Sequence, residues 1–176
     1  MVKIIVGGNM LSEPFNDIVI PVNTEGVMGA GLAKAFKTVY PLTFTTYRNL
    51  CLSKRLKVNN TIRLSTQGVR YAVMFPTKKE WRKPSKMSYL VNGLVDVKEK
   101  YREKGMVEVG WPVLGGGLGG LDREKVLRTM LEELDSWINI NYVYITTEDL
   151  AVLTSTRWFK KLNIELLDWE LRKYKP

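Results

Sequence analysis

The sequence contains no histidine among its 176 residues. Histidine is the side chain whose charge changes near neutral pH, and it is also the commonest metal ligand. Its absence excludes a histidine general base, a Ser-His or Cys-His catalytic pair, and a zinc ion held by histidine. Any catalytic step in this protein must therefore use other side chains.

Cysteine occurs once, at Cys51. A single cysteine forms neither an internal disulfide nor a thiolate cluster for a metal, which suits a reducing compartment. Cys51 lies in a segment whose apolar residues recur at helical spacing. We therefore expect a small buried hydrophobic side chain there, and a nucleophilic thiol is the alternative.

Long apolar runs are also missing, since none approaches the roughly 18 residues that a membrane-spanning helix needs. The first eight residues read as a short strand followed by two glycines, not as a signal sequence. The expectation is a soluble, intracellular protein.

Acidic residues are fewer than basic ones, 18 against 27, which gives a formal net charge of +9. Such a balance favours a polyanionic partner, because a positive field attracts phosphate groups. The alternative is that the charge serves only solubility.

Strands and helices are predicted to alternate along the chain. Apolar runs predict strands at residues 2–6, 18–22, 61–65, 71–75, 107–114, 142–145 and 164–167. Helical spacing predicts helices at 31–40, 43–52, 85–104, 122–138 and 151–161, with an irregular basic loop at 76–84. This alternation predicts one α/β sandwich with a mainly parallel sheet.

Two glycine-rich loops follow two of these strands, each just ahead of a helix. The first has glycines at 26, 29 and 31, and the second has five glycines in residues 115–120. Helix N-termini bind phosphate, and glycine lets an anion approach the main chain. Loops that follow parallel strands gather at one sheet edge. A shared phosphate site is one interpretation, and two tight turns are the other, because neither loop has the spacing of a known nucleotide fingerprint.

Three motifs carry a resemblance to a known family. They are NTEGVMGAGLA at 23–33 with Phe36-Lys37 and Tyr40-Pro41, FPTK at 75–78, and PVLGGGLGGLD at 112–122. In this order and spacing, residues 1–147 resemble a macro domain. Among macro domains they resemble the DarG branch, whose members are antitoxins that remove ADP-ribose from thymidine bases in DNA.

The resemblance implies a three-layer α/β/α sandwich with a mixed, mainly parallel sheet. It implies a single domain over residues 1–176, with a core at about 1–147 and an extension at 148–176 of unassigned role. The implied partners are ADP-ribose or ADP-ribosylated DNA and a DarT-like toxin counterpart. A monomer in the cytoplasm of a bacterial cell, or a phage protein acting there, is expected, with no cofactor, metal or membrane involved.

The resemblance also implies site residues. The Asn23 amide would reach a ribose hydroxyl, the first loop would hold the distal ribose, and the second would wrap the diphosphate. The implied ligand-binding residues are Asn9, Gly26, Val27, Met28, Gly29, Ala30, Gly31, Thr77, Trp81, Gly115, Gly116, Gly117, Leu118 and Gly119.

Two positions depart from other macro domains. Many members have a Gly-Asp pair after the first strand, whose aspartate lies against the adenine amino group. In this chain the corresponding pair is Gly8-Asn9. A neutral amide loses the charge-assisted part of the hydrogen bond. A related hydrolase branch has a catalytic acid at the position of Gly119, where this chain, like the DarG branch, has none.

Lys78 is the catalytic candidate that remains. It is followed by Lys79, and like charges nearby favour a neutral amine. A neutral amine could attack the anomeric carbon of the ribose or its opened aldehyde form. A protonated one could stabilise charge on the departing base or the diphosphate. Without the resemblance, Lys78 would be an ordinary surface charge.

The basic loop at 77–84 fits DNA on physical grounds as well. Cations follow the phosphate backbone, and an exposed Trp81 could stack on a base. The alternative is a tryptophan lid over apolar surface.

The leading hypothesis is a hydrolase that cleaves the bond between ADP-ribose and a nucleobase, thymidine, in single-stranded DNA, with Lys78 and Asn23 in the catalytic site. The alternatives are a phosphatase acting on ADP-ribose 1″-phosphate and a non-catalytic ADP-ribose reader.

Overall fold

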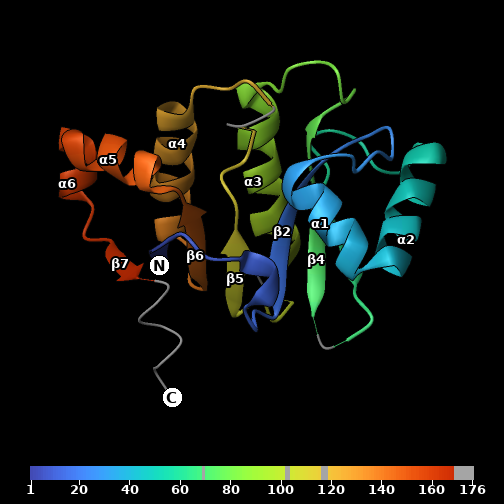
Figure 1. Ribbon diagram of the computed structural model, residues 1–176, viewed down its shortest axis with the longest axis horizontal. Coiled ribbons are helices and arrows are strands. Elements are labelled where there is room, and N and C mark those ends of the chain that lie inside the picture. Colours follow the sequence, from blue (N-terminus) through green and yellow to red (C-terminus); the bar gives the residue numbers. More distant parts are fainter. Residues whose placement is uncertain (69, 102–103, 116–118, 169–176) are drawn as a thin grey trace.

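The computed structural model describes residues 1–68, 70–101, 104–115 and 119–168 (Figure 1). Within these residues, seven strands form one sheet in the order β3-β4-β2-β5-β6-β1-β7. Neighbouring strands are parallel except β3 and β4, which are antiparallel. The strands are β1 Val2–Val6, β2 Asp17–Asn23, β3 Ile62–Ser65, β4 Tyr71–Lys78, β5 Glu108–Trp111, β6 Ile140–Ile145 and β7 Glu165–Asp168.

Helices cover both faces of this sheet. They are η1 Met10–Ser12, α1 Gly31–Val39, α2 Pro41–Leu52, α3 Met87–Tyr101, α4 Arg123–Asp135, α5 Thr147–Ser155 and α6 Arg157–Lys161. One hydrophobic cluster joins α1 and α2 to one face, and a second joins α3, α4, α5 and α6 to the other. The predicted three-layer α/β/α sandwich is confirmed (Figure 1).

Central strands alternate their side chains between these two clusters. On β2, Ile18, Ile20 and Val22 pack toward α1 and α2, whereas Val19 packs toward α3 and α4. A strand covered on both faces is apolar throughout, which is why this segment reads as a continuous hydrophobic run.

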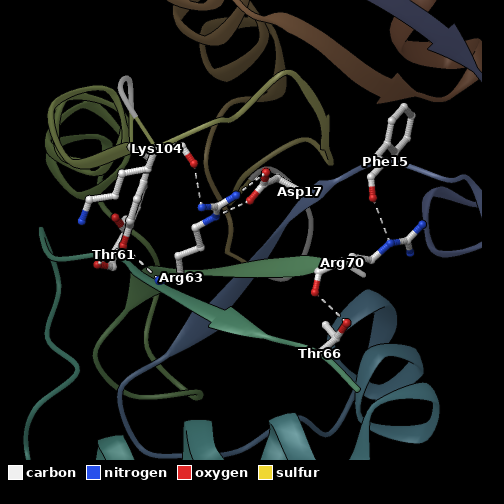
Figure 2. Close-up of polar contacts among 8 residues, drawn as sticks. Phe15, Asp17, Thr61, Arg63, Thr66, Arg70 and Lys104 are labelled. Carbon is white, nitrogen blue, oxygen red and sulfur yellow. Dashed lines mark hydrogen bonds and ion pairs between the residues drawn. The ribbon is translucent and has the colours of Figure 1, made fainter. Parts of the chain in front are cut away.

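At the end of the sheet where β2 begins, a buried ion pair joins β2 to β3 (Figure 2). The Arg63 guanidinium donates two hydrogen bonds to the fully buried Asp17 carboxylate, at 2.6 and 2.9 Å. Arg70 donates to the Phe15 carbonyl at 3.1 Å in the same region. Leaving one member of such a pair alone typically costs about 3–5 kcal/mol. These contacts tie the start of β2 to the β3–β4 hairpin.

Several element boundaries differ from the predictions. β4 continues to Lys78, although residues 76–78 were expected in a loop. β3 pairs with β4 only as far as Met74, so Pro76 lies where the strand has a single neighbour and a missing N–H is tolerated. The helix expected to include Ile138 ends at Asp135, and the Ile138 side chain is 79% exposed.

The C-terminal region belongs to the same sheet. The helix predicted at 151–161 is two helices, because the backbone of Thr156 is extended between them. A capping box between Thr146 and Asp149 also starts α5 earlier than predicted. β7 then pairs in parallel with β1. None of the helices in the described ranges has the length and apolarity to cross a membrane.

Candidate functional site

The two glycine-rich loops leave the sheet from neighbouring strands. The first follows β2 and the second follows β5, and these strands are parallel partners. The chain after β4 leaves at the same edge, because β4 is the parallel partner on the other side of β2 (Figure 1). The expected convergence of the loops at one edge therefore follows from the strand order.

Asn23 organises the first loop from within. Its Oδ1 accepts hydrogen bonds from the Glu25 and Val27 main-chain N–H groups at 3.1 and 3.2 Å. Its Nδ2 donates to the Val27 carbonyl at 2.8 Å. The side chain is nearly buried, and the second N–H of the amide is the group left to reach a ribose hydroxyl. The predicted role of Asn23 therefore depends on an amide that also clasps the loop.

Tyr47 and Cys51 support Asn23 from α2. The Tyr47 hydroxyl lies 2.8 Å from the Asn23 carbonyl oxygen and 3.0 Å from Oδ1. Burial keeps the pKa of Tyr47 well above its ordinary value, so the hydroxyl remains a donor. Burial also raises the pKa of the Cys51 thiol to about 11. The expectation that Cys51 is a buried hydrophobic side chain is confirmed.

The remainder of the first loop presents mainly backbone to the edge of the sheet. Gly26 has φ +87°, a conformation that residues with a Cβ rarely adopt, and a Cβ there would lie 3.2 Å from the Arg48 side chain, so a larger residue would be strained. Gly29 and Ala30 are exposed just ahead of Gly31, where α1 begins. Ala30 is the N-cap and its methyl group accepts no hydrogen bond, which leaves the first amides of α1 for an anion.

Val27 and Met28, both predicted to contact the ligand, differ in the exposure of their side chains. The Val27 side chain is 41% exposed at the surface of the loop. The Met28 side chain is buried in the cluster under α1 and α2. Only the main chain of Met28 is placed to meet a ligand.

The second loop is anchored to the segment that follows β4. The Ser85 N–H donates to the Gly119 carbonyl at 2.8 Å, and the Leu121 N–H donates to the Gly115 carbonyl at 3.1 Å. A Cβ on Gly119 would lie 2.3 Å from the Gly115 oxygen and 2.5 Å from Ser85 Oγ. These distances allow no side chain at Gly119 without a shift of the main chain.

Gly116, Gly117 and Leu118, which were also predicted to bind the ligand, lie outside the described residues.

Lys78 stands beside Asn23 at the ends of their strands. The two residues are register partners, directly after a bulge between Val22 and Asn23. The Lys78 amine donates to the Trp81 carbonyl at 3.3 Å. Thr77, the preceding residue, is buried. The two residues predicted to be catalytic are thus brought together, although 55 positions separate them in the sequence.

Trp81 lies on the turn after β4. Its side chain is 50% exposed, with the Arg82 guanidinium 4.7 Å from the ring centroid. Lys79 and Lys83 are exposed on the same turn. We call residues 79–83 the rim turn.

Asn9 lies at the same edge, after β1. Its Oδ1 accepts a hydrogen bond from the Leu11 N–H at 3.0 Å and caps η1. Next to it, Gly7, Gly8 and Val113 help to line an open cavity of about 510 Å³. The oxygen keeps a second lone pair and the amide nitrogen is a donor, so the Asn9 side chain retains groups for a base edge.

Four side chains at this edge were not singled out from the sequence, those of Glu25, Arg48, Tyr47 and Ser85. Glu25 accepts the Trp81 N–H at 2.8 Å, Ser85 contacts the second loop, and Arg48 lies against Gly26. For Tyr47 a signal did exist, because a buried tyrosine hydroxyl nearly always has a hydrogen-bond partner. Glu25 and Ser85 gave no comparable signal, since their partners are distant in the sequence.

Comparison with known families and proteins agrees with this geometry. The family model described as the Macro domain matches residues 19–130. A DNA ADP-ribosyl glycohydrolase of Mycobacterium tuberculosis is 35% identical over 139 residues, which is 77% of this chain and 40% of that protein. A DNA ADP-ribosyl transferase–DNA ADP-ribosyl glycohydrolase fusion protein of Thermosipho africanus is 29% identical over 136 residues, 67% of this chain and 35% of that protein. The chain thus spans about two fifths or less of these relatives.

Solved structures give the same picture. The macrodomain of Mycobacterium tuberculosis DarG superposes with a TM-score of 0.78 at 33% identity, covering 82% of this chain and 97% of that one. Thermosipho africanus DarTG in complex with ADP-ribose superposes with a TM-score of 0.77 at 26% identity, covering 83% of this chain and 42% of that one.

Proposed function

The chain belongs to the macro domain family, and from this membership we propose that it binds ADP-ribose and hydrolyses the bond between ADP-ribose and a thymidine base in single-stranded DNA. The names of the relatives support the activity, and the solved complex with ADP-ribose supports the ligand. The observation that carries the proposal is the pairing of Asn23 with Lys78 at the start of the first glycine-rich loop.

In the proposed complex, main-chain amides hold the diphosphate. The N-terminus of α1 and the second loop supply donors without side chains in the way, and the N-terminal end of the helix dipole favours negative charge. The Asn23 amide orients the distal ribose. This arrangement brings the anomeric carbon toward the end of β4, where Lys78 stands.

The proposed reaction replaces a bond to the base by a bond to water. The bond between the anomeric carbon and the base nitrogen breaks, its electron pair leaves with the base, and the base takes up a proton. The hydroxyl of the water ends on the anomeric carbon, giving free ADP-ribose and restored DNA. Lys78 serves either as the first nucleophile or as a cation that stabilises the leaving charge. Borohydride traps a covalent lysine–sugar adduct only in the first case.

The rim turn is the proposed contact for DNA. Its lysines and Arg82 pair with phosphates, and the exposed Trp81 stacks on a base next to the modified one. Stacking of this kind is worth about 1–3 kcal/mol per base. Binding of a modified oligonucleotide should weaken steeply with salt, whereas binding of free ADP-ribose should respond far less.

The deciding experiment compares wild type with Lys78→Ala on an oligonucleotide that carries ADP-ribosylated thymidine. Release by the wild type, its loss in the variant, and equal ADP-ribose affinity in both would support the proposal. Release of phosphate from ADP-ribose 1″-phosphate, with none of ADP-ribose from DNA, would support a phosphatase instead. Binding of ADP-ribose without turnover of either substrate would support a reader.

The proposal extends to the setting of the protein. The Thermosipho africanus fusion protein, named for a transferase and a glycohydrolase, supports a DarT-like transferase as the counterpart whose modification this protein reverses. We further propose that it acts as a monomer in the cytoplasm, with the core at residues 1–147 and the extension at 148–176 forming one domain.

A further inference from the structure

Glu25 is linked to the amine of Lys78 by two consecutive hydrogen bonds. Glu25 Oε2 accepts the Trp81 N–H at 2.8 Å, and the Lys78 amine donates to the Trp81 carbonyl at 3.3 Å. The Glu25 carboxylate therefore holds the peptide group between Glu80 and Trp81. The Lys78 amine contacts the carbonyl of Trp81, which belongs to the next peptide group.

The first loop and the rim turn are joined by further contacts at the same place. The Thr24 N–H and hydroxyl both donate to the Lys79 carbonyl, at 3.1 and 3.0 Å. Within the turn, the Lys83 N–H donates to the Glu80 carbonyl at 3.1 Å. Thr24 thus fixes the start of the turn, and Glu25 fixes its middle, where the contact with the amine is made.

The negative charge of Glu25 helps to hold the basic rim turn in place. The rim turn carries Lys79, Arg82 and Lys83 next to Lys78, and like charges push one another apart. A carboxylate offsets part of this repulsion, and its hydrogen bond to a main-chain N–H is of the stronger, charge-assisted kind.

The conformation of the first loop depends on Asn23 and not on the Glu25 side chain. Asn23 holds the main chain of the first loop through the Glu25 and Val27 N–H groups, without using the Glu25 side chain. Loss of the carboxylate should therefore leave the sugar-binding loop in place and release only the rim turn.

We propose that Glu25 is a positioning residue, which fixes the rim turn so that its Trp81 carbonyl aims the Lys78 amine at the sugar. The inference rests on the proposed function, because it assigns a role in that reaction.

The test uses three variants of the whole chain on the ADP-ribosylated oligonucleotide. Glu25→Ala should lower kcat roughly ten- to a hundredfold, as expected for a misplaced catalytic group, with KM and the ADP-ribose Kd changed less than about twofold. Glu25→Gln keeps an oxygen that accepts the Trp81 N–H but loses the charge, so it should recover part of kcat. The matched control is Glu80→Ala, which removes the acid of the rim turn itself, whose carboxylate pairs with Lys83. It should behave as wild type.

A second readout does not depend on activity. The Trp81 main-chain N–H should exchange with deuterium slowly in wild type and Glu25→Gln and faster in Glu25→Ala. Unchanged exchange in Glu25→Ala would overturn the inference, and so would equal losses of kcat in the Ala and Gln variants. If exchange changes as expected but the wild type releases no ADP-ribose from DNA, the proposed function has failed, and the role of Glu25 in catalysis fails with it.

Discussion

Placing an acid at Gly119 tests the account of the second loop most directly. A related hydrolase branch has a catalytic acid at this position, so Gly119→Asp asks whether the chain can accept one. The Cβ of any side chain would lie 2.3 Å from the Gly115 oxygen, 2.8 Å from the Gly115 carbonyl carbon and 2.5 Å from Ser85 Oγ. Ser85 Oγ could rotate away, but the main chain of Gly115 could not. Its carbonyl already accepts the Leu121 N–H.

The magnitude follows from these contacts. Forcing atoms into a packed site costs typically about 1–3 kcal/mol, and this contact is with main chain, so the upper part of the range applies. Displacing Gly119 would also weaken the hydrogen bond from the Ser85 N–H, worth about 1 kcal/mol. A total of about 3–4 kcal/mol lowers the Tm of a chain of this size by about 6–16 °C.

Thermal unfolding and calorimetric titration with ADP-ribose would measure the two consequences. Gly119→Ala and Gly119→Asp should both lose stability, and both should bind ADP-ribose more weakly because the second loop is displaced. Gly68→Ala, at the opposite edge of the sheet, is the matched control, since a Cβ there meets no atom within 4 Å. A Gly119→Asp protein with an unchanged Tm and unchanged ADP-ribose affinity would show that the second loop accommodates a side chain at this position.

Three further predictions concern the supports of the site and of the fold. Asn23→Ala leaves the Glu25 and Val27 N–H groups without their acceptor, while the Tyr47 hydroxyl keeps the main-chain carbonyl of residue 23, so we expect a loss of about 2–3 kcal/mol in denaturant unfolding and weaker ADP-ribose binding. Equal stability in wild type and variant would contradict it. Cys51 should resist iodoacetamide at pH 8 in the native protein and react after unfolding in guanidinium, because burial raises its pKa to about 11; rapid native labelling would show that the thiol is accessible. A hydrogen bond from Arg123 lowers the pKa of Asp149, so the ion pair stabilises the fold fully above the ordinary pKa of 3.8, and this contribution is lost as the pH falls through the lowered pKa. Asp149→Asn should therefore cost about 1–2 kcal/mol at pH 7 and progressively less as the pH falls below 3.8, and a difference that does not depend on pH would exclude this role.

Local patterns predicted most of the elements because the sheet is covered on both faces. The apolar runs at Val2–Val6 and Ile18–Val22 are strands with side chains in both clusters, as their composition indicates. The end of β4 was not predictable in this way. Pro76 reads locally as a break, and only the missing neighbour on one side of β4 explains why the strand continues.

Some residues of the site were indicated by the sequence motifs, and others were found only in the structure. Motif order indicated the glycine-rich loops, Asn23 and Lys78, and the strand order confirms that both loops leave the sheet at one edge. The motifs gave no information about Glu25, whose partner Trp81 is 56 positions away. They also gave none about the space at Gly119, which is limited by Gly115 and Ser85.

By itself, the sequence determined which chemistry is absent, which segments are buried, and which family the motifs resemble, because all three depend on residue identity and short-range spacing. The tertiary structure decided that Asn23 and Lys78 are neighbours, that Glu25 holds the rim turn, and that Gly119 admits no side chain. These facts depend on strand order and on loops that meet only after the sheet has formed. No local pattern encodes the distance between residues that are brought together by the register of two strands.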